Sequence, residues 1–470
     1  MTAASNAASK KEIYGLIAAV VVPAIVLLMP TPEGLGIPGQ RMIALFAFIL
    51  ILWSTEALPI AIGSLLALVL QPLLGLADLN TAFRNFIGLV FFFVLIMFIV
   101  ALAWVKTGLA HRFALTLITK AGTESRRVIY VFTIGAGLIS LVVSDVPTCA
   151  IFMAVAIGII EKLKLEPGKS QFAKGLMLAI PMGALVGGVG TIAGSSINVL
   201  GLQIIQDNGG PEISFLQWMA VGIPMVIILL PITAFVISRA FKPEIDNIGD
   251  IDDIKKELAD LGPLTPAEWK VIVIQSLMLA FWIAGTWVPA FNVVTVGVFG
   301  ATAMFLPGIR LFTWKEAQAA TGWEILMMAG AVATLGAASS SSGLAQRLVD
   351  ISLGGLADYP IVLILGFISV FTVLIHLMLP VSPVINAIMI PPIMLLAIEA
   401  GVNPALCALP VIFTASCAML IPLDPVPLLT FSKGYYTMFD MFKPGAIISL
   451  VWVVVMTAIL MTVGPAIGLM

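Results

Sequence analysis

Residues 143–148 read VSDVPT, and residues 381–386 read VSPVIN. Each phrase lies inside a long apolar stretch, and each follows a matching marker, TGLAHR at 107–112 and SGLAQR at 342–347. This pattern indicates a duplication in which both copies carry polar, helix-breaking residues within a hydrophobic segment. In a membrane such breaks are tolerated only where they face protein or a water-filled cavity. Paired breaks at matching places in two halves point to the binding site of a transporter.

The composition is that of a protein that spans a membrane. Hydrophobic residues make up 60% of the 470 residues, charged residues only 10%, and the mean hydropathy is +1.13. A soluble domain carries about 25% charged residues. The two His and three Cys suggest neither a metal cluster nor a disulfide framework. Since no nucleophile with its base is visible either, we expect neither an enzyme nor a nucleic-acid partner.

Eleven apolar segments are long enough to cross a bilayer, which takes about twenty residues. Two further stretches, 128–162 and 358–400, are too long for one crossing and are interrupted by the two phrases. We interpret both as re-entrant hairpins, and the alternative is two ordinary helices with a tight turn in each case. The eleven expected crossings are 13–30, 41–56, 57–76, 86–106, 172–205, 214–238, 268–289, 291–308, 319–343, 404–432 and 444–468.

The positions of Lys and Arg give an orientation, because these residues are enriched in cytoplasmic loops. With the N-terminus inside and each hairpin returning to its own side, all but three of the 23 basic residues fall on one face. The C-terminus is then external. The three exceptions are Arg41, Arg84 and Arg347.

The predicted fold is an all-α polytopic membrane protein with an inverted repeat, about eleven transmembrane helices and two re-entrant hairpins. Residues 1–40 form the cytoplasmic N-terminus and first helix. Residues 41–238 and 268–470 form the two repeats, each with five crossings and a hairpin. An odd number of crossings sets the copies in opposite orientations. The linker 239–267 is interpreted as a solvated cytoplasmic connector.

Each hairpin is followed by a helix that is itself broken. The first break, 187–198, reads GGVGTIAGSSIN, in which Gly permits unwinding and Ser and Asn offer polar groups. The second, 421–427, reads IPLDPVP, and its prolines cannot continue a helix. Helix N-termini at such breaks hold an anion without Lys or Arg, and unwound carbonyls coordinate a cation. Gly183 and Gly187 are instead expected to serve close helix packing.

Asp145 and Asp424 each lie within an interruption, one in each half. A carboxylate at bilayer depth is costly and indicates a functional site. Either residue could coordinate Na⁺ or carry a proton. The alternative is a structural cap, in which the carboxylate accepts hydrogen bonds from backbone N–H groups at a helix start.

An ordered set of motifs resembles the divalent anion/sodium symporter family, which includes bacterial dicarboxylate carriers and animal citrate transporters. The resemblance covers the chain from about residue 41 to residue 468. Its motifs are WSTEALP at 53–59, LQPLLG at 70–75, WEIL at 323–326, ASCA at 415–418 and FDMFKPG at 439–445.

The family carries a Ser-Asn-Thr triplet at each hairpin tip, which binds substrate carboxylate and helps to form sodium sites. The equivalent positions here are 144–146 (SDV) and 382–384 (SPV), so only the serines match. The resemblance implies one cation site, whereas the second lacks its polar or small residues at Met378, Val381, Pro383 and Leu423. The residues implied for the first site, a possible Na⁺ site, are Ser140, Ser144, Asp145 and Gly194.

The resemblance also implies an elevator mechanism, in which the hairpins and broken helices move as one unit against a scaffold that forms a homodimer. The predicted function is a secondary carrier of small di- or tricarboxylates, by anion exchange or by coupling to one Na⁺ or H⁺. The expected location is a bacterial inner membrane. The candidate substrate-binding residues are Ser144, Asp145, Ser195, Ser196, Asn198, Ser382, Asn386 and Asp424.

Other functions compete with this prediction. A cation/H⁺ antiporter, or another anion carrier of the wider ion transporter superfamily, also fits an intramembrane Asp at a broken helix. An ion channel is a further alternative, although inverted re-entrant elements favour alternating access.

Overall fold

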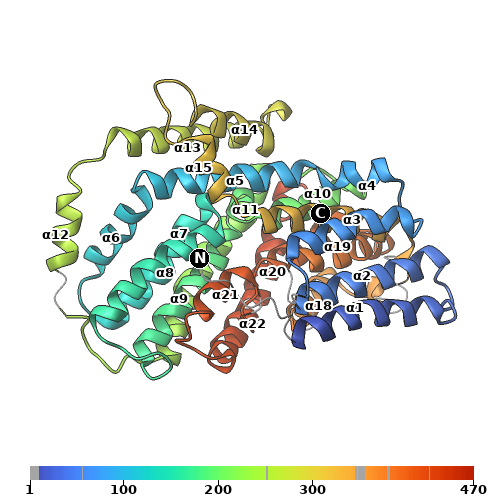
Figure 1. Ribbon diagram of the computed structural model, residues 1–470, viewed down its shortest axis with the longest axis horizontal. Helices are drawn as coiled ribbons and strands as arrows, with labels where there is room; N and C mark the ends of the chain where they lie inside the picture. Colours follow the sequence, from blue (N-terminus) through green and yellow to red (C-terminus); the bar gives the residue numbers. More distant parts are fainter. Residues whose placement is uncertain are drawn as a thin grey trace.

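The computed structural model describes residues 10–55, 57–249, 252–344, 347, 355–377, 382–422 and 424–469. This part of the chain is all-helical, which confirms the predicted fold class (Figure 1). The helices of the first half are α1 (Lys10–Leu28), α2 (Ile37–Thr55), α3 (Ile60–Leu73), α4 (Leu79–Phe86), α5 (Leu89–Lys106), α6 (Leu109–Ala121), α7 (Ser125–Val143), α8 (Asp145–Lys162), α9 (Gln171–Gly188), η1 (Ile192–Gly194), α10 (Ser196–Asp207) and α11 (Phe215–Ala240). Those that follow are α12 (Asp252–Asp260), α13 (Pro266–Ala284), η2 (Pro289–Phe291), α14 (Val293–Ala303), α15 (Trp314–Ala320), α16 (Trp323–Ser341), η3 (Leu356–Asp358), α18 (Ile361–Ile375), α19 (Ser382–Glu399), α20 (Pro404–Ala415), α21 (Pro425–Phe431), α22 (Met438–Val463) and η4 (Pro465–Ile467).

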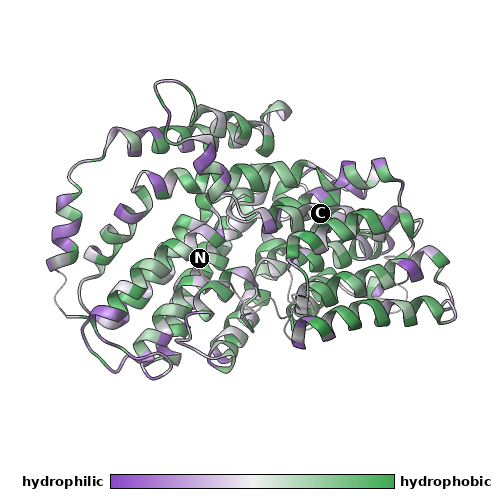
Figure 2. Ribbon diagram, viewed as in Figure 1, coloured by the Kyte–Doolittle hydropathy of each residue, from purple (hydrophilic) through white to green (hydrophobic). Residues whose placement is uncertain are grey.

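Seven helical segments in the described ranges are long and apolar enough to cross a membrane, and six shorter apolar helices accompany them. Apolar residues dominate nearly all of these helices, whereas polar residues concentrate in α12, in loops and at helix ends (Figure 2). The chain is therefore an integral membrane protein. The seven long segments are Leu79–Lys106, Ser125–Val143, Phe215–Ala240, Pro266–Ala284, Trp323–Ser341, Ser382–Glu399 and Met438–Val463.

The two interrupted stretches each form a pair of helices. Residues 128–162 lie in α7 and α8, which meet at Ser144 and pack against one another. Ser144 has a φ of +78°, a left-handed value that is rare outside glycine and reverses the chain in one residue. In the second half α19 begins at Ser382. Met378 and Val381, which the sequence places at this tip, lie outside the described residues.

The helices form two packing groups. In one, α3, α4 and α5 contact α16, and α5 also contacts α14. The other contains the paired and broken helices, and there each half completes the other, because α10 packs on α19 and α20 while α21 packs on α8 and α9. In Figure 1, α6 to α9 lie on the left, α1 to α3 on the right, and α20 to α22 between them. The groups meet where α10 contacts α5 and α16, and where α19 contacts α16.

Glycine allows α7 and α9 to approach closely. A methyl group on Gly183 would lie 2.2 Å from the carbonyl oxygen of Thr133, and one on Gly187 would lie 2.0 Å from that of Gly137. Neither position has room for a side chain. The expectation that Gly183 and Gly187 serve helix packing is confirmed.

The linker is more than a solvated connector. Its residues 244–248 run beside the start of α7, where Ser125 N donates to the carbonyl of Asp246 and Ile248 N donates to that of Thr123. Glu244 accepts hydrogen bonds from Ser170 and from the backbone of Phe172 at the start of α9. Partial burial opposes ionisation of Glu244, but these hydrogen bonds outweigh it and lower the pKa of the carboxyl. The first part of the linker is thus bound to α7 and α9.

The second part of the linker is bound to α6, a helix that we did not expect from the sequence. Arg112 on α6 forms a two-pronged ion pair with Glu268 on α13, at 2.6 and 3.1 Å, and donates to the carbonyl of Gly262 at 2.7 Å. Glu268 is only 2% exposed. Three further short helices, α4, α12 and α15, were also unexpected, because each is too short and polar to stand out from the loops around it.

Candidate functional site

The first tip is held by hydrogen bonds around the start of α8. Asp145 Oδ1 accepts from the backbone N of Val146 at 2.8 Å and from the hydroxyl of Ser144 at 3.2 Å. The hydroxyl of Thr148 donates to the carbonyl of Ser144 at 2.6 Å. The carboxylate of Asp145 also interacts with the side chain of Ser195 across the first break, and Asp145 is 5% exposed. The predicted capping contact therefore exists, but it uses only part of this buried carboxylate.

Two oxygen atoms and the side chain of Asp145 border the space that a side chain on Gly188 would occupy. A methyl group on Gly188 would lie 3.0 Å from the carbonyl oxygen of Gly194, 3.3 Å from Ser140 Oγ and 3.6 Å from Asp145 Cβ. The hydroxyl of Ser140 is fully buried and has no hydrogen-bond partner among the described residues. A buried hydroxyl without a partner costs about 1–3 kcal/mol. We call Ser140, Asp145, Gly188 and Gly194 the oxygen cradle, and a small cation would satisfy its unpaired oxygen.

Asn198 ties the two halves together beside the cradle. Its amide nitrogen donates to the carbonyls of Gly188 at 2.8 Å and Thr191 at 3.0 Å, and its amide oxygen accepts from Ser416 at 2.9 Å. The polar atoms of Asn198 are thus committed to the protein. Asn198 holds the unwound segment in place, and this use differs from the substrate contact predicted for it.

Asn386 forms a second link between the halves. Its amide nitrogen donates to the carbonyl of Ile197 at 3.0 Å. Asn386 is fully buried, and its Oδ1 has no partner in the part of the chain that the structure describes. One polar atom of this residue therefore remains free to bind a ligand.

The second tip is closed by a carboxylate from the second break. Asp424 precedes α21 and accepts from the backbone N of Val426 at 3.1 Å and from the hydroxyl of Ser382 at 2.5 Å. Cys149 on α8 donates to the carbonyl of Val426 at 3.3 Å, which brings the second break against the first hairpin. The second break is longer than predicted, because α20 already ends at Ala415. Leu423 lies outside the described residues.

A small cavity of about 30 Å³ lies beside the first tip. Ser144, Asp145 and Ser196 face it from one side, and Phe98 of α5 and Ile325 of α16 close it from the other. This volume holds one or two water molecules. A dicarboxylate would not fit in this volume.

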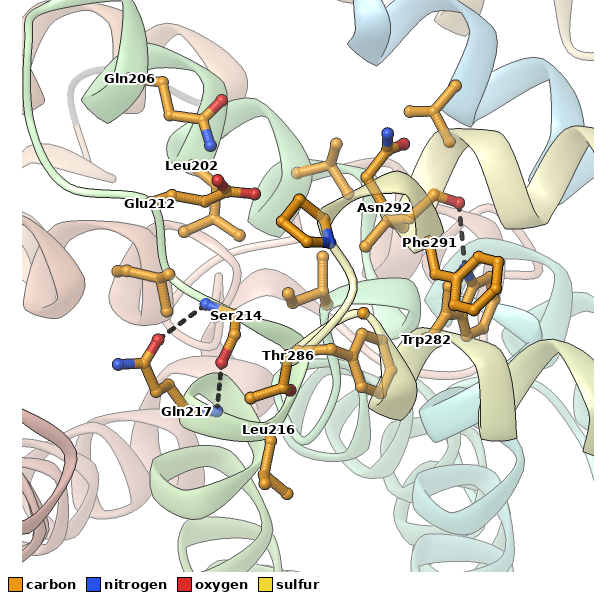
Figure 3. Close-up of a pocket in the computed structure, with 18 of the residues that line it drawn as sticks. Leu202, Gln206, Glu212, Ser214, Leu216, Gln217, Trp282, Thr286, Phe291 and Asn292 are labelled. Carbon is orange, nitrogen blue, oxygen red and sulfur yellow. Dashed lines mark hydrogen bonds between the residues drawn. The ribbon is translucent and has the colours of Figure 1, made fainter.

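A much larger cleft of about 980 Å³ opens between α10, the start of α11, the junction of α13 and α14, and η4. Figure 3 shows Glu212, Gln217, Thr286 and Asn292 around it, and Trp282 against its wall. The predicted site residues do not line this cleft. Ile192, which lies in the first break as the first residue of η1, lines one part of this cleft.

The structure brings the predicted site residues into one region at the contacts between the hairpins and the broken helices. Neither Asp145 nor Asp424 forms a salt bridge within the described ranges. Sequence reasoning missed the contacts of Gly188, Thr191 and Ser416. Ser416 stood out only as part of a family motif, and Gly188 and Thr191 act through backbone carbonyls that no residue type marks.

Comparison with known proteins agrees with this architecture. A sodium-dependent dicarboxylate transporter, SdcS, of Staphylococcus saprophyticus is 29% identical over 97% of this chain and 92% of its own length. SdcS of Staphylococcus aureus is 28% identical over the same shares of the two chains. A membrane protein of Cupriavidus necator is 28% identical over 87% of this chain and 84% of its own.

Solved structures with a similar fold are membrane transporters. Neisseria gonorrhoeae MtrF, from a class of antimetabolite efflux pumps, has a TM-score of 0.51 and 15% identity over 96% of this chain and 95% of its own. Alcanivorax borkumensis YdaH has the same TM-score and identity over 81% and 86%. The family model described as sodium:sulfate symporter transmembrane region matches residues 10–470. The chain therefore belongs to this family of divalent anion/sodium symporters and is a membrane transporter, not an enzyme.

Proposed function

We propose that the protein is a secondary carrier that couples the uptake of a small dicarboxylate to Na⁺. The oxygen cradle is the observation that carries this proposal, because it joins a buried carboxylate, a hydroxyl without a partner and a carbonyl from an unwound segment. Such a set suits a hard cation. The relatives named sodium-dependent dicarboxylate transporters support both the cation and the cargo.

The residues divide into two roles in this proposal. Ser140, Asp145, Gly188 and Gly194 hold the cation, and Ser144 steadies the carboxylate of Asp145. Ser196 then contacts the substrate, since it faces the small cavity beside the first tip. A cation bound in the oxygen cradle offsets the negative charge of Asp145, which would otherwise repel an incoming dicarboxylate. Na⁺ binding and anion binding are thereby coupled.

We further infer, from the way the helices pack, how the two packing groups move during transport. The small cavity is walled by α5 and α16 of one packing group and by the first tip of the other. Because it is too small for a dicarboxylate, the groups must shift against each other during transport. An elevator motion of the hairpins and broken helices, a homodimeric scaffold, an inverted repeat, a cytoplasmic N-terminus and an external C-terminus complete the proposal.

The test is uptake of labelled succinate, malate or citrate by the purified protein in liposomes. With an inward Na⁺ gradient we expect uptake well above that of protein-free vesicles, and little uptake when choline replaces Na⁺. Uptake equal to empty vesicles for every anion, with or without internal counter-anion, refutes the proposal. Uptake that needs internal anion and ignores Na⁺ would identify an exchanger, and proton release driven by Na⁺ alone would identify a cation antiporter.

Ser140→Ala tests the cradle itself. We expect it to weaken Na⁺ activation by about tenfold or more, the cost of one hydrogen-bonding group to a charge. Thr133→Val is the matched control, because Thr133 is a buried hydroxyl on the same helix that donates to the carbonyl of Ile129. Equal Na⁺ activation in the two variants would remove Ser140 from the cation site.

A further inference from the structure

Asp424 is a buried carboxylate whose hydrogen-bond donors are both neutral. It is 4% exposed, and its two oxygens accept from the backbone of Val426 and from the hydroxyl of Ser382. A charge held in a membrane protein by neutral donors alone is costly. Capping alone does not explain the carboxylate, since Asn caps a helix equally well.

Within the described ranges, Asp424 forms no salt bridge that would offset its charge. Asp145 lies near enough to repel it. The basic residue of the neighbouring helix α9, Lys174, is paired with Asp440 on α22 at 3.0 Å. Besides Asp145, α8 carries Cys149 and, at its other end, Glu161 and Lys162, while α19 ends in Glu399. Cys417 lies before α21, Tyr436 after α21 and His376 at the end of α18.

The direction of the hydrogen bond between Ser382 and Asp424 depends on whether the Asp424 carboxyl carries a proton. When Asp424 is ionised, it can only accept, so the Ser382 hydroxyl is used as the donor. When Asp424 carries a proton, its own O–H can donate to Ser382 Oγ, and the Ser382 hydroxyl is released to donate elsewhere. The free hydroxyl is then available to an anionic ligand. Protonation also removes a negative charge that would repel that ligand.

We propose that Asp424 binds a transported proton and that Ser382 couples this proton to the bound anion. The proposal rests on the dicarboxylate carriage proposed above. A proton from the water on the side where the site opens adds to Asp424 Oδ2, the Ser382 hydroxyl turns to the anion, and both steps reverse on release. Asn386, one turn further along α19 and with a free Oδ1, lies on the same helix face as Ser382.

The test uses the full-length protein in liposomes that contain a pH-sensitive dye, with equal Na⁺ on both sides and external succinate. At about pH 7 to 8 succinate is almost fully ionised, so protons that accompany it are carried by the protein. We expect succinate entry to acidify the lumen. An imposed inward gradient of about one pH unit should raise the equilibrium succinate ratio by about tenfold for one coupled proton. Succinate uptake by the wild type without acidification overturns the proton proposal and leaves the carrier proposal intact.

The variant Asp424→Asn tests whether Asp424 is the residue that binds the transported proton. The amide can cap α21 and donate to Ser382 but cannot carry a proton, so we expect the acidification per succinate carried to be lost. Asp78→Asn is the control, because Asp78 is an exposed Asp that caps α4 through the backbone N of Thr81. Acidification by Asp424→Asn at the wild-type rate overturns the assignment. If Asp424→Asn does not fold, the pH dependence of succinate binding is measured for Ser382→Ala instead. The same pH dependence as in the wild type refutes the coupling, and loss of the pH dependence supports it. No succinate uptake by the wild type overturns both proposals.

Discussion

A single methyl group at Gly188 would test the oxygen cradle most directly. In Gly188→Ala the new Cβ lies 3.0 Å from the carbonyl oxygen of Gly194, 3.3 Å from Ser140 Oγ and 3.6 Å from Asp145 Cβ. The methyl group therefore stands between the groups that we assign to the cation. A hard cation holds its oxygen ligands at about 2.3–2.6 Å. The methyl group would keep these oxygens from reaching that distance from the cation.

The effect on folding should be much smaller than the effect on the cation. Replacing a helical Gly by Ala contributes about 0.4–1 kcal/mol of stability through the unfolded chain. Crowding against Gly194 and Ser140 costs about 1–3 kcal/mol in return. The protein should fold with a modest net loss. Its half-saturating Na⁺ concentration should rise at least about tenfold, which corresponds to about 1.4 kcal/mol.

Two measurements separate these effects. Succinate uptake against Na⁺ concentration gives the activation curve, and Tm in detergent with and without Na⁺ reports binding without transport. A ligand at about 100 times its Kd stabilises by about 2.7 kcal/mol, so wild type should show a Na⁺-dependent Tm and Gly188→Ala should not. Gly158→Ala on α8 is the control, because a methyl group there meets nothing within 4 Å. Wild-type Na⁺ activation in Gly188→Ala would refute the cradle.

Three further outcomes follow from other parts of the molecule. Gly187→Ala places Cβ 2.0 Å from the carbonyl of Gly137 and should lower Tm sharply, at a cost of about 3 kcal/mol or more, whereas Gly366→Ala, which meets nothing within 4 Å, should not. Arg112→Gln leaves Glu268 buried without its cation and should cost about 3–5 kcal/mol in unfolding measurements; an unchanged Tm would show that the pair is dispensable. With one Na⁺ and one H⁺ per dianion, uptake should be electroneutral, so a K⁺-valinomycin potential that changes the initial rate would contradict that stoichiometry.

The sequence predicts the elements of the site better than the contacts within it. Gly, Pro and Asp inside apolar runs identify both breaks, because such residues are costly in a membrane helix unless the break is used. The same reasoning finds the turn at Ser144, whose φ is +78°. It cannot find Gly188 and Thr191, since they contribute backbone carbonyls. It also misses α6, whose Arg112 is explained only by Glu268, far along the chain.

Asp145 at the first tip and Asp424 at the second tip are both buried carboxylates, but different groups surround them. Each half brings one carboxylate to the contact between the halves, and the interruptions contain no Lys or Arg to balance it. At the first tip the carbonyl oxygen of Gly194 and Ser140 Oγ border the same space as Asp145, and we assign a metal cation to that space. At the second, Ser382 donates a hydrogen bond to Asp424, and Pro383 offers no polar side chain, so we assign a proton to Asp424. α10 packs on α19 and α21 packs on α8, so each break lies against a helix of the other half of the chain. The coupling between cations and anion that we propose would act through these contacts between the two halves of the chain.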